Sequence, residues 1–109
     1  MNKNERQVEL LRSLIEEKKE IEKIINALPR GYISSKTISG HVYNYRQWRE
    51  GKKIFSEYVP DAFLPAVKRK IASRKEQEES LKAVKKEIKS ASKFVIKHGL
   101  MTEEEINSL

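Results

Sequence analysis

Cysteine is absent from this chain of 109 residues, and proline and glycine are rare. Without cysteine the chain can form neither a disulfide nor a thiolate metal site, which favours a reducing compartment. No apolar run approaches the roughly 20 residues that a membrane-spanning helix needs, and the charged N-terminus lacks the apolar stretch of a secretion signal. We therefore expect a cytoplasmic protein with no membrane partner.

Residues typical of catalysis are also scarce. The two histidines, His41 and His98, are isolated in the sequence, and neither a zinc-protease motif nor a nucleophile elbow is present. The glycines are too dispersed to form a phosphate-binding loop, and no base accompanies Ser34 or Ser35. These absences predict a non-enzymatic protein with no cofactor and no metal site.

Charge is abundant and unevenly distributed. Charged residues make up 36% of the chain, and the net charge is +7. Residues 1–28 are neutral overall, residues 29–98 are basic, and residues 99–109 are acidic. A basic middle favours an anionic partner. The alternative is that lysine simply serves as a soluble helix-forming residue.

The pattern of apolar residues predicts a first helix over residues 4–28. Asn4 is the expected N-cap, with Gln7 in the position of a capping box, and Pro29 ends the helix. Its apolar seam consists of residues spaced three or four positions apart, as in a coiled coil. Its residues are Leu11, Leu14, Lys18, Ile21, Ile25 and Leu28.

Residues 32–59 are rich in β-branched and aromatic residues and predict a three-stranded antiparallel meander. The expected strands are 32–38, 41–48 and 53–59. A two-residue turn at Ser39-Gly40 would place Ile38 opposite His41. The second turn is either a two-residue loop at Glu50-Gly51 or a three-residue loop that adds Arg49, and the two choices place opposite faces of the third strand beside Tyr43 and Tyr45.

A long helix is predicted over residues 61–98 and a short helix over 102–109. The long helix starts either at Asp61 as its cap or after a short turn, with Pro65 in the first helical position. Val67, Arg74, Leu81, Ile88 and Val95 recur every seven residues, and Gly99 is a natural C-cap. Thr102 and Glu105 form a second capping box. The predicted class is α+β, mostly α: an antiparallel helical hairpin with an inserted meander, in a single domain.

The longer helix would leave apolar surface unmatched near Ile88 and Val95. Either the tail, through Ile106 and Leu109, or a second copy of the chain would cover this surface. We expect a homodimer.

Basic and aromatic residues gather in the meander, a combination suited to phosphates and bases. We expect Arg46, Arg49, Lys52 and Lys53 to contact phosphate, and Trp48 with Tyr45 to stack. The other candidates are Lys36 and Arg30. Some aromatic residues must instead form core, and Arg46 with Trp48 would equally suit a protein partner.

The long helix carries a row of lysines, here called the lysine ridge: Lys75, Lys82, Lys86, Lys89, Lys93 and Lys97. At 100° per residue these lysines, with Lys68, fall within an arc of roughly 80°, interrupted by Glu79. Such a ridge could follow phosphates. The alternative is an ordinary solvated helix face.

The Leu28-Pro29-Arg30-Gly31-Tyr32-Ile33-Ser34 segment, Tyr43-Asn44-Tyr45 and the Gln47-Trp48-Arg49-Glu50-Gly51-Lys52 turn resemble a group of small uncharacterised bacterial proteins. This resemblance implies a bacterial or phage origin and no known activity. The meander is also faintly similar to the arm-type DNA-binding sheet of tyrosine recombinases, although no recombinase catalytic domain follows.

The sequence therefore predicts a small nucleic-acid-binding protein. The alternatives are a protein-interaction adaptor or inhibitor, such as an antitoxin-like protein of a mobile element, and a structural dimeric coiled coil.

Overall fold

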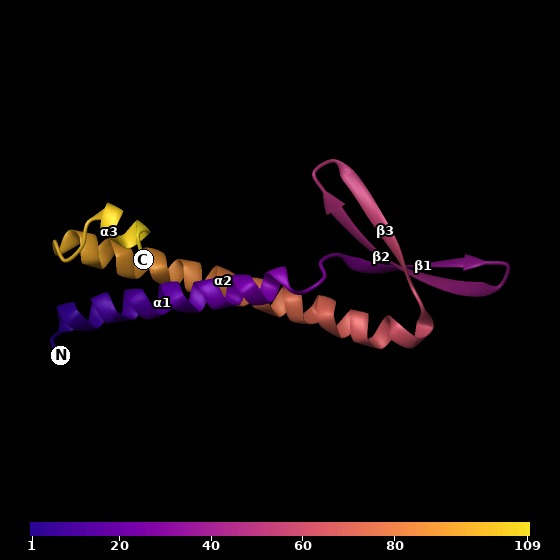
Figure 1. Ribbon diagram of the computed structural model, residues 1–109, viewed down its shortest axis with the longest axis horizontal. Coiled ribbons are helices and arrows are strands. Elements are labelled where there is room, and N and C mark those ends of the chain that lie inside the picture. The colour runs from indigo at the N-terminus through magenta and orange to yellow at the C-terminus, as the bar shows by residue number, and fades with distance from the viewer. The chain divides into compact units, whose positions relative to one another are not determined.

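The computed structural model describes all residues, 1–109, and its elements follow the predicted order. The elements are α1 (Lys3–Asn26), β1 (Tyr32–Ile38), β2 (His41–Glu50), β3 (Lys53–Val59), the 3-10 turn η1 (Asp61–Phe63), α2 (Leu64–Lys97) and α3 (Glu103–Asn107) (Figure 1). A three-stranded antiparallel sheet lies between two long helices in the sequence, which confirms the predicted class. The chain forms two compact units, which are Met1–Ile24 with Gln77–Leu109, and Ile25–Glu76.

In the first unit, α1 and the later turns of α2 run antiparallel (Figure 1). The predicted seam of α1 is buried there except at half-buried Lys18, whereas in the predicted seam of α2 Val95 is buried and Leu81 and Ile88 are half-buried. The buried side chains are Leu11, Leu14, Ile21, Val84, Ala91, Val95 and Met101. Apolar burial of this kind stabilises a helix pair that intrinsic helix propensity alone would not hold together.

The C-terminal tail folds back as the tail alternative predicted. Gly99 has a φ of 65°, and the backbone N–H of Leu100 donates to the carbonyl of Val95 at 2.9 Å, which ends α2 in a Schellman motif. The predicted capping box of Thr102 and Glu105 begins α3. Lys19 Nζ then donates to the carbonyl of Leu109 at 2.8 Å.

The tail also covers apolar surface on α2. Ile106 and Leu109 line one hollow together with Ile88 and Ile15, and Val95 has no exposed surface. The unmatched surface that suggested a second copy is therefore reduced within the single chain. The homodimer stays a prediction, now without that argument.

Both ends of α1 differ from the prediction. Asn2, and not Asn4, caps the helix, because its Oδ1 accepts from the backbone N–H of Glu5 at 2.8 Å. The helix ends at Asn26 and not at residue 28. Arg74 explains this early end, since its Nη1 donates to the carbonyls of Ile25 at 2.8 Å and Leu28 at 2.6 Å. A side chain from α2 thus satisfies carbonyls that a helix end leaves unpaired.

The sheet confirms the first predicted turn and corrects the second. Ile38 pairs with His41 across Ser39-Gly40, as predicted. Glu50 pairs with Lys53, so the second turn is Gly51-Lys52, and both predicted loops were wrong. Strand β2 consequently extends to Glu50 and not only to residue 48. The physical reason is that Glu50 is held by side-chain contacts described below.

The start of α2 follows the second predicted alternative. The backbone N–H of Phe63 donates to the carbonyl of Pro60 at 2.9 Å in η1, and Pro65 lies in the first turn of the helix. Ile71 is buried here although the heptad pattern did not include it. In this unit Val59 is buried as well.

Gly31 is required by a close approach of backbone to backbone. Its φ is +108°, and a Cβ at this position would overlap the backbone carbonyl oxygen of Gln47. Sequence reasoning assigned Gly31 only to a reversal of the chain, whereas its larger role is to admit β2 beside the segment that enters β1.

We predict that Gly31→Ala destabilises the fold more than Gly51→Ala. Gly51 has a φ of +60° but open space around it, so alanine there meets only backbone strain of roughly 1–2 kcal/mol. Gly31→Ala adds an overlap that should cost about 1–3 kcal/mol more. Urea unfolding of both variants measures the difference, and equal midpoints would contradict the assignment.

Candidate functional site

The strand register divides the sheet into two faces, because successive side chains of a strand point to opposite sides and paired residues share a side. The arginine face carries Ile33, Ser35, Thr37, Val42, Asn44, Arg46, Trp48, Glu50, Lys53, Phe55, Glu57 and Val59. The tyrosine face carries Tyr32, Ser34, Lys36, Ile38, His41, Tyr43, Tyr45, Gln47, Arg49, Ile54, Ser56 and Tyr58.

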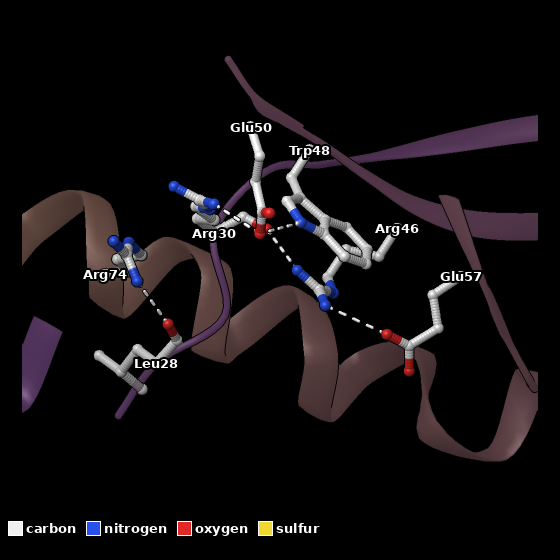
Figure 2. A network of polar contacts seen from close by, with 7 residues as sticks. All are labelled: Leu28, Arg30, Arg46, Trp48, Glu50, Glu57 and Arg74. Carbon is white, nitrogen blue, oxygen red and sulfur yellow. Dashed lines mark hydrogen bonds and ion pairs between the residues drawn. The ribbon is translucent and has the colours of Figure 1, made fainter. Parts of the chain in front are cut away.

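Arg46 is the centre of a polar network on the arginine face (Figure 2). Its guanidinium lies 3.8 Å from the ring centroid of Trp48, and its Nη1 donates to the carbonyl of Arg30 at 2.8 Å. Its Nη2 pairs with Glu57 at 3.1 Å, and the Arg46 side chain is only 16% exposed. A guanidinium engaged in this way is committed to structure, because each of these contacts would have to break before it met a phosphate.

Trp48 belongs to the same network. Its ring stacks on Phe55 with centroids 5.6 Å apart and planes 15° apart. Its Nε1–H donates to Glu50 at 3.2 Å. With Arg46 over the ring as well, Trp48 is held by three neighbours and is poorly placed to stack on a base.

Glu50 joins the sheet to the segment before it. Arg30 Nη2 lies 2.8 Å from Glu50 Oε1. The hydrogen bonds from Arg30 and then from Trp48 lower the pKa of the Glu50 carboxyl below its usual range. The adjoining hollow, about 390 Å³ in volume, is lined by Arg30, Arg46, Trp48, Glu50, Arg74 and three neighbours. Both carboxylates of the sheet, Glu50 and Glu57, are therefore on the arginine face and paired with arginine.

The tyrosine face presents aromatic surface to solvent. It holds all four tyrosines of the chain, and Tyr32 and Tyr58 are 54% and 50% exposed. Tyr58 lies 5.8 Å from Tyr45 and 6.3 Å from Tyr43, measured between ring centroids. His41 continues the row, 4.8 Å from Tyr43.

The tyrosine face carries no acidic residue. Lys36 and Arg49 are its cations, and Lys36 Nζ lies 5.4 Å from the Tyr45 ring centroid. Arg49, Lys52 and Lys53 gather at the exposed β2–β3 turn, and none of them forms an ion pair. The result is an aromatic surface with basic and no acidic side chains.

The predicted site residues thus separate into two groups. Arg30, Arg46 and Trp48 lie together in the polar network, whereas Lys36, Tyr45 and Arg49 share the tyrosine face. Sequence reasoning did not include Tyr32, Tyr43 and Tyr58 in the site. The alternation of side chains along each strand could have placed these tyrosines on one face, but only if the register set by the second turn had been known.

The lysine ridge is exposed along its whole length. None of its lysines forms an ion pair. It remains a separate candidate surface on α2.

Comparison with known families supports the resemblance at a general level. Residues 9–69 match a domain of unknown function, DUF6788. The chain belongs to the DUF6788 family. The matched residues include the whole meander, with the arginine network and the tyrosine face, and end before Arg74 and the lysine ridge. No curated protein and no solved structure matches this DUF6788 chain. None of its helices combines the length and apolar character required to cross a bilayer.

We predict an acid transition that the only tryptophan reports. The pKa of Glu50 is lower in the folded than in the unfolded state. The ionised carboxylate therefore contributes to folding stability above the unfolded-state pKa, and this contribution is lost as pH falls through the folded-state pKa. Trp48 fluorescence should therefore change below the ordinary range of a glutamate. Glu50→Gln should abolish this change and Glu57→Gln should retain it. An unaltered titration in Glu50→Gln would refute the assignment.

Proposed function

We propose that this DUF6788 protein binds single-stranded nucleic acid, without catalysis, through the tyrosine face of its sheet. The observation that carries the proposal is the separation of charge by face. All four tyrosines lie on the one face that has no acidic residue, while both carboxylates of the sheet are paired with arginine on the other.

Stacking is the first element of the proposed mechanism. Exposed aromatic rings on a sheet offer platforms for unpaired bases, and every base has a face that can stack. Tyr45 and Tyr58 would each accept a base, and Tyr43 beside Tyr58 would extend the platform. A duplex hides its base faces in its own stack, so the tyrosine face favours single strands.

Phosphate contact is the second element. Lys36 and Arg49 flank the rings on the same face, and Lys52 and Lys53 add charge at the turn. We assign phosphate binding to these side chains and no longer to Arg30 and Arg46, whose hydrogen bonds hold the arginine face together. Cytoplasmic location and a bacterial or mobile-element origin belong to the same proposal.

A protein-binding adaptor is the second candidate, and exposed apolar residues on the same face favour it. Ile38 and Ile54 are 52% and 61% exposed and lie at the margins of the tyrosine face. A protein partner would bury them and would resist both nuclease and high salt. Absence of any affinity of the parent for single-stranded DNA or RNA at low salt would reject the nucleic-acid proposal in favour of this one.

Removal of one ring should weaken binding without unfolding the sheet. Tyr58→Thr introduces a β-branched side chain that favours a strand but removes the platform. We expect affinity for a mixed single-stranded oligonucleotide to fall about 5- to 150-fold, from roughly 1–3 kcal/mol per stacked base. Fluorescence anisotropy measures the affinity. Tyr58→Phe is the matched control and should bind like the parent, and equal affinity of all three proteins would exclude stacking on Tyr58.

An added carboxylate should weaken oligonucleotide binding strongly only when it lies on the tyrosine face. Ser56 is exposed on the tyrosine face, and Thr37 is exposed on the arginine face. Ser56→Glu should lower oligonucleotide affinity about tenfold, and Thr37→Glu, with the same change in net charge, should lower it much less. Anisotropy titrations at one salt concentration make the comparison. Equal losses would show that net charge, and not the face, determines binding.

A further inference from the structure

The lysines of the ridge form a continuous exposed row without ion pairs. On α1, Lys19 lies 3.7 Å from Glu16 and Lys23 lies 3.3 Å from Glu20. On α2, the five ridge lysines from Lys82 to Lys97 form no ion pair and are all exposed. The ridge is therefore a row of cations that no carboxylate of the chain pairs with.

The position of the ridge along α2 gives its shape. From Lys82 to Lys97 the helix rises roughly 22 Å at 1.5 Å per residue. The lysines stay on one side of the helix over this length, and only Glu79, at the margin, has opposite charge within the arc. A straight row of this length can follow several phosphates of one strand, which rise about 3.4 Å each.

A membrane surface fits the ridge poorly. A helix that lies in a membrane interface needs an exposed apolar face beside its basic one. Val84, Ala91 and Val95 form the apolar side of this stretch, and they are 6%, 4% and 0% exposed. Their burial in the hairpin leaves Ile96, which is 45% exposed, as the one large apolar side chain open to solvent between Lys82 and Lys97, and one side chain is not an apolar face.

An acidic protein also fits poorly. Protein interfaces depend on a few aromatic and arginine anchors, whereas this arc offers only lysines. Lysine is a compact point charge on a flexible stem, which suits repeated, loosely oriented contacts with phosphates.

We infer that the lysine ridge binds the sugar–phosphate backbone of nucleic acid and is a contact surface separate from the tyrosine face. The inference goes beyond the proposed function, because backbone contact needs no accessible base and therefore includes duplexes. Each lysine that meets a phosphate releases counterions, so the ridge governs how steeply affinity falls with salt.

Mixed-sequence duplex DNA is the appropriate probe, because its bases are closed to the tyrosine face. In the double variant Lys86→Gln with Lys93→Gln, the slope of log affinity against log salt should become shallower by about 2, at about 0.9 per phosphate contact. Lys19→Gln with Lys23→Gln is the matched control, since it removes the same charge from the same unit. The control should keep the parental slope.

The inference would be overturned by no duplex binding of the parent at low salt, by an unchanged slope in the ridge variant, or by an equal loss in the control. Circular dichroism checks that each variant is folded, and Lys89→Gln with Lys97→Gln serves as a second ridge variant. A larger loss of binding to phosphatidylserine vesicles than to duplex would also overturn it and indicate a membrane. Tyr58→Thr should leave duplex binding unchanged. Duplex binding therefore tests the ridge, single-strand binding tests the tyrosine face, and either proposal can be rejected without the other.

Discussion

The candidate site depends on one constraint, the register between β2 and β3. The pairing of Glu50 with Lys53 sets which side chains share a face. It places Glu57 opposite Arg46 and Tyr58 opposite Tyr45, so that ion pairs form on one side and rings gather on the other. A shift of one residue would exchange the faces of β3 and leave a carboxylate among the tyrosines. The candidate site and the fold therefore rest on the same pairing.

The arginine face shows how this register is maintained. The two-residue turn at Gly51-Lys52, which was not the turn that the sequence suggested, closes the hairpin in one alignment. The stack of Trp48 on Phe55 and the engagement of Arg46 by Glu57 add side-chain contacts between β2 and β3 that only one alignment satisfies. The carboxylate of Glu57 is exposed, so its ion pair with Arg46 is individually weak. The value of this pair lies in selecting the alignment more than in adding stability.

The long periodic elements could be predicted from the sequence because each pattern acts locally. The seam of α1, the first hairpin turn at Ser39-Gly40 and the capping box of Thr102 follow from neighbouring residues, and the structure confirms them. The early end of α1 depends on Arg74, which is 49 residues from Ile25. The roles of Gly31 and Arg46 likewise arise from contacts across the sheet. Composition identified the right segment for the site but could not separate its two faces.

The division of labour between arginine and lysine extends this argument to specificity. Arg30, Arg46 and Arg74 use their planar, multiple donors for carbonyls and carboxylates of the chain itself. Ridge lysines are left without ion pairs, and on the tyrosine face Arg49 is the one arginine. Bidentate reading of base edges needs side chains held in fixed positions, such as arginine or lysine on guanine and asparagine or glutamine on adenine. Gln47 accepts a hydrogen bond from Tyr32, and buried Asn44 accepts one from Ser35 on the other face. A surface of rings and point charges recognises the polymer and not its sequence, so the proposed binding should vary little among sequences.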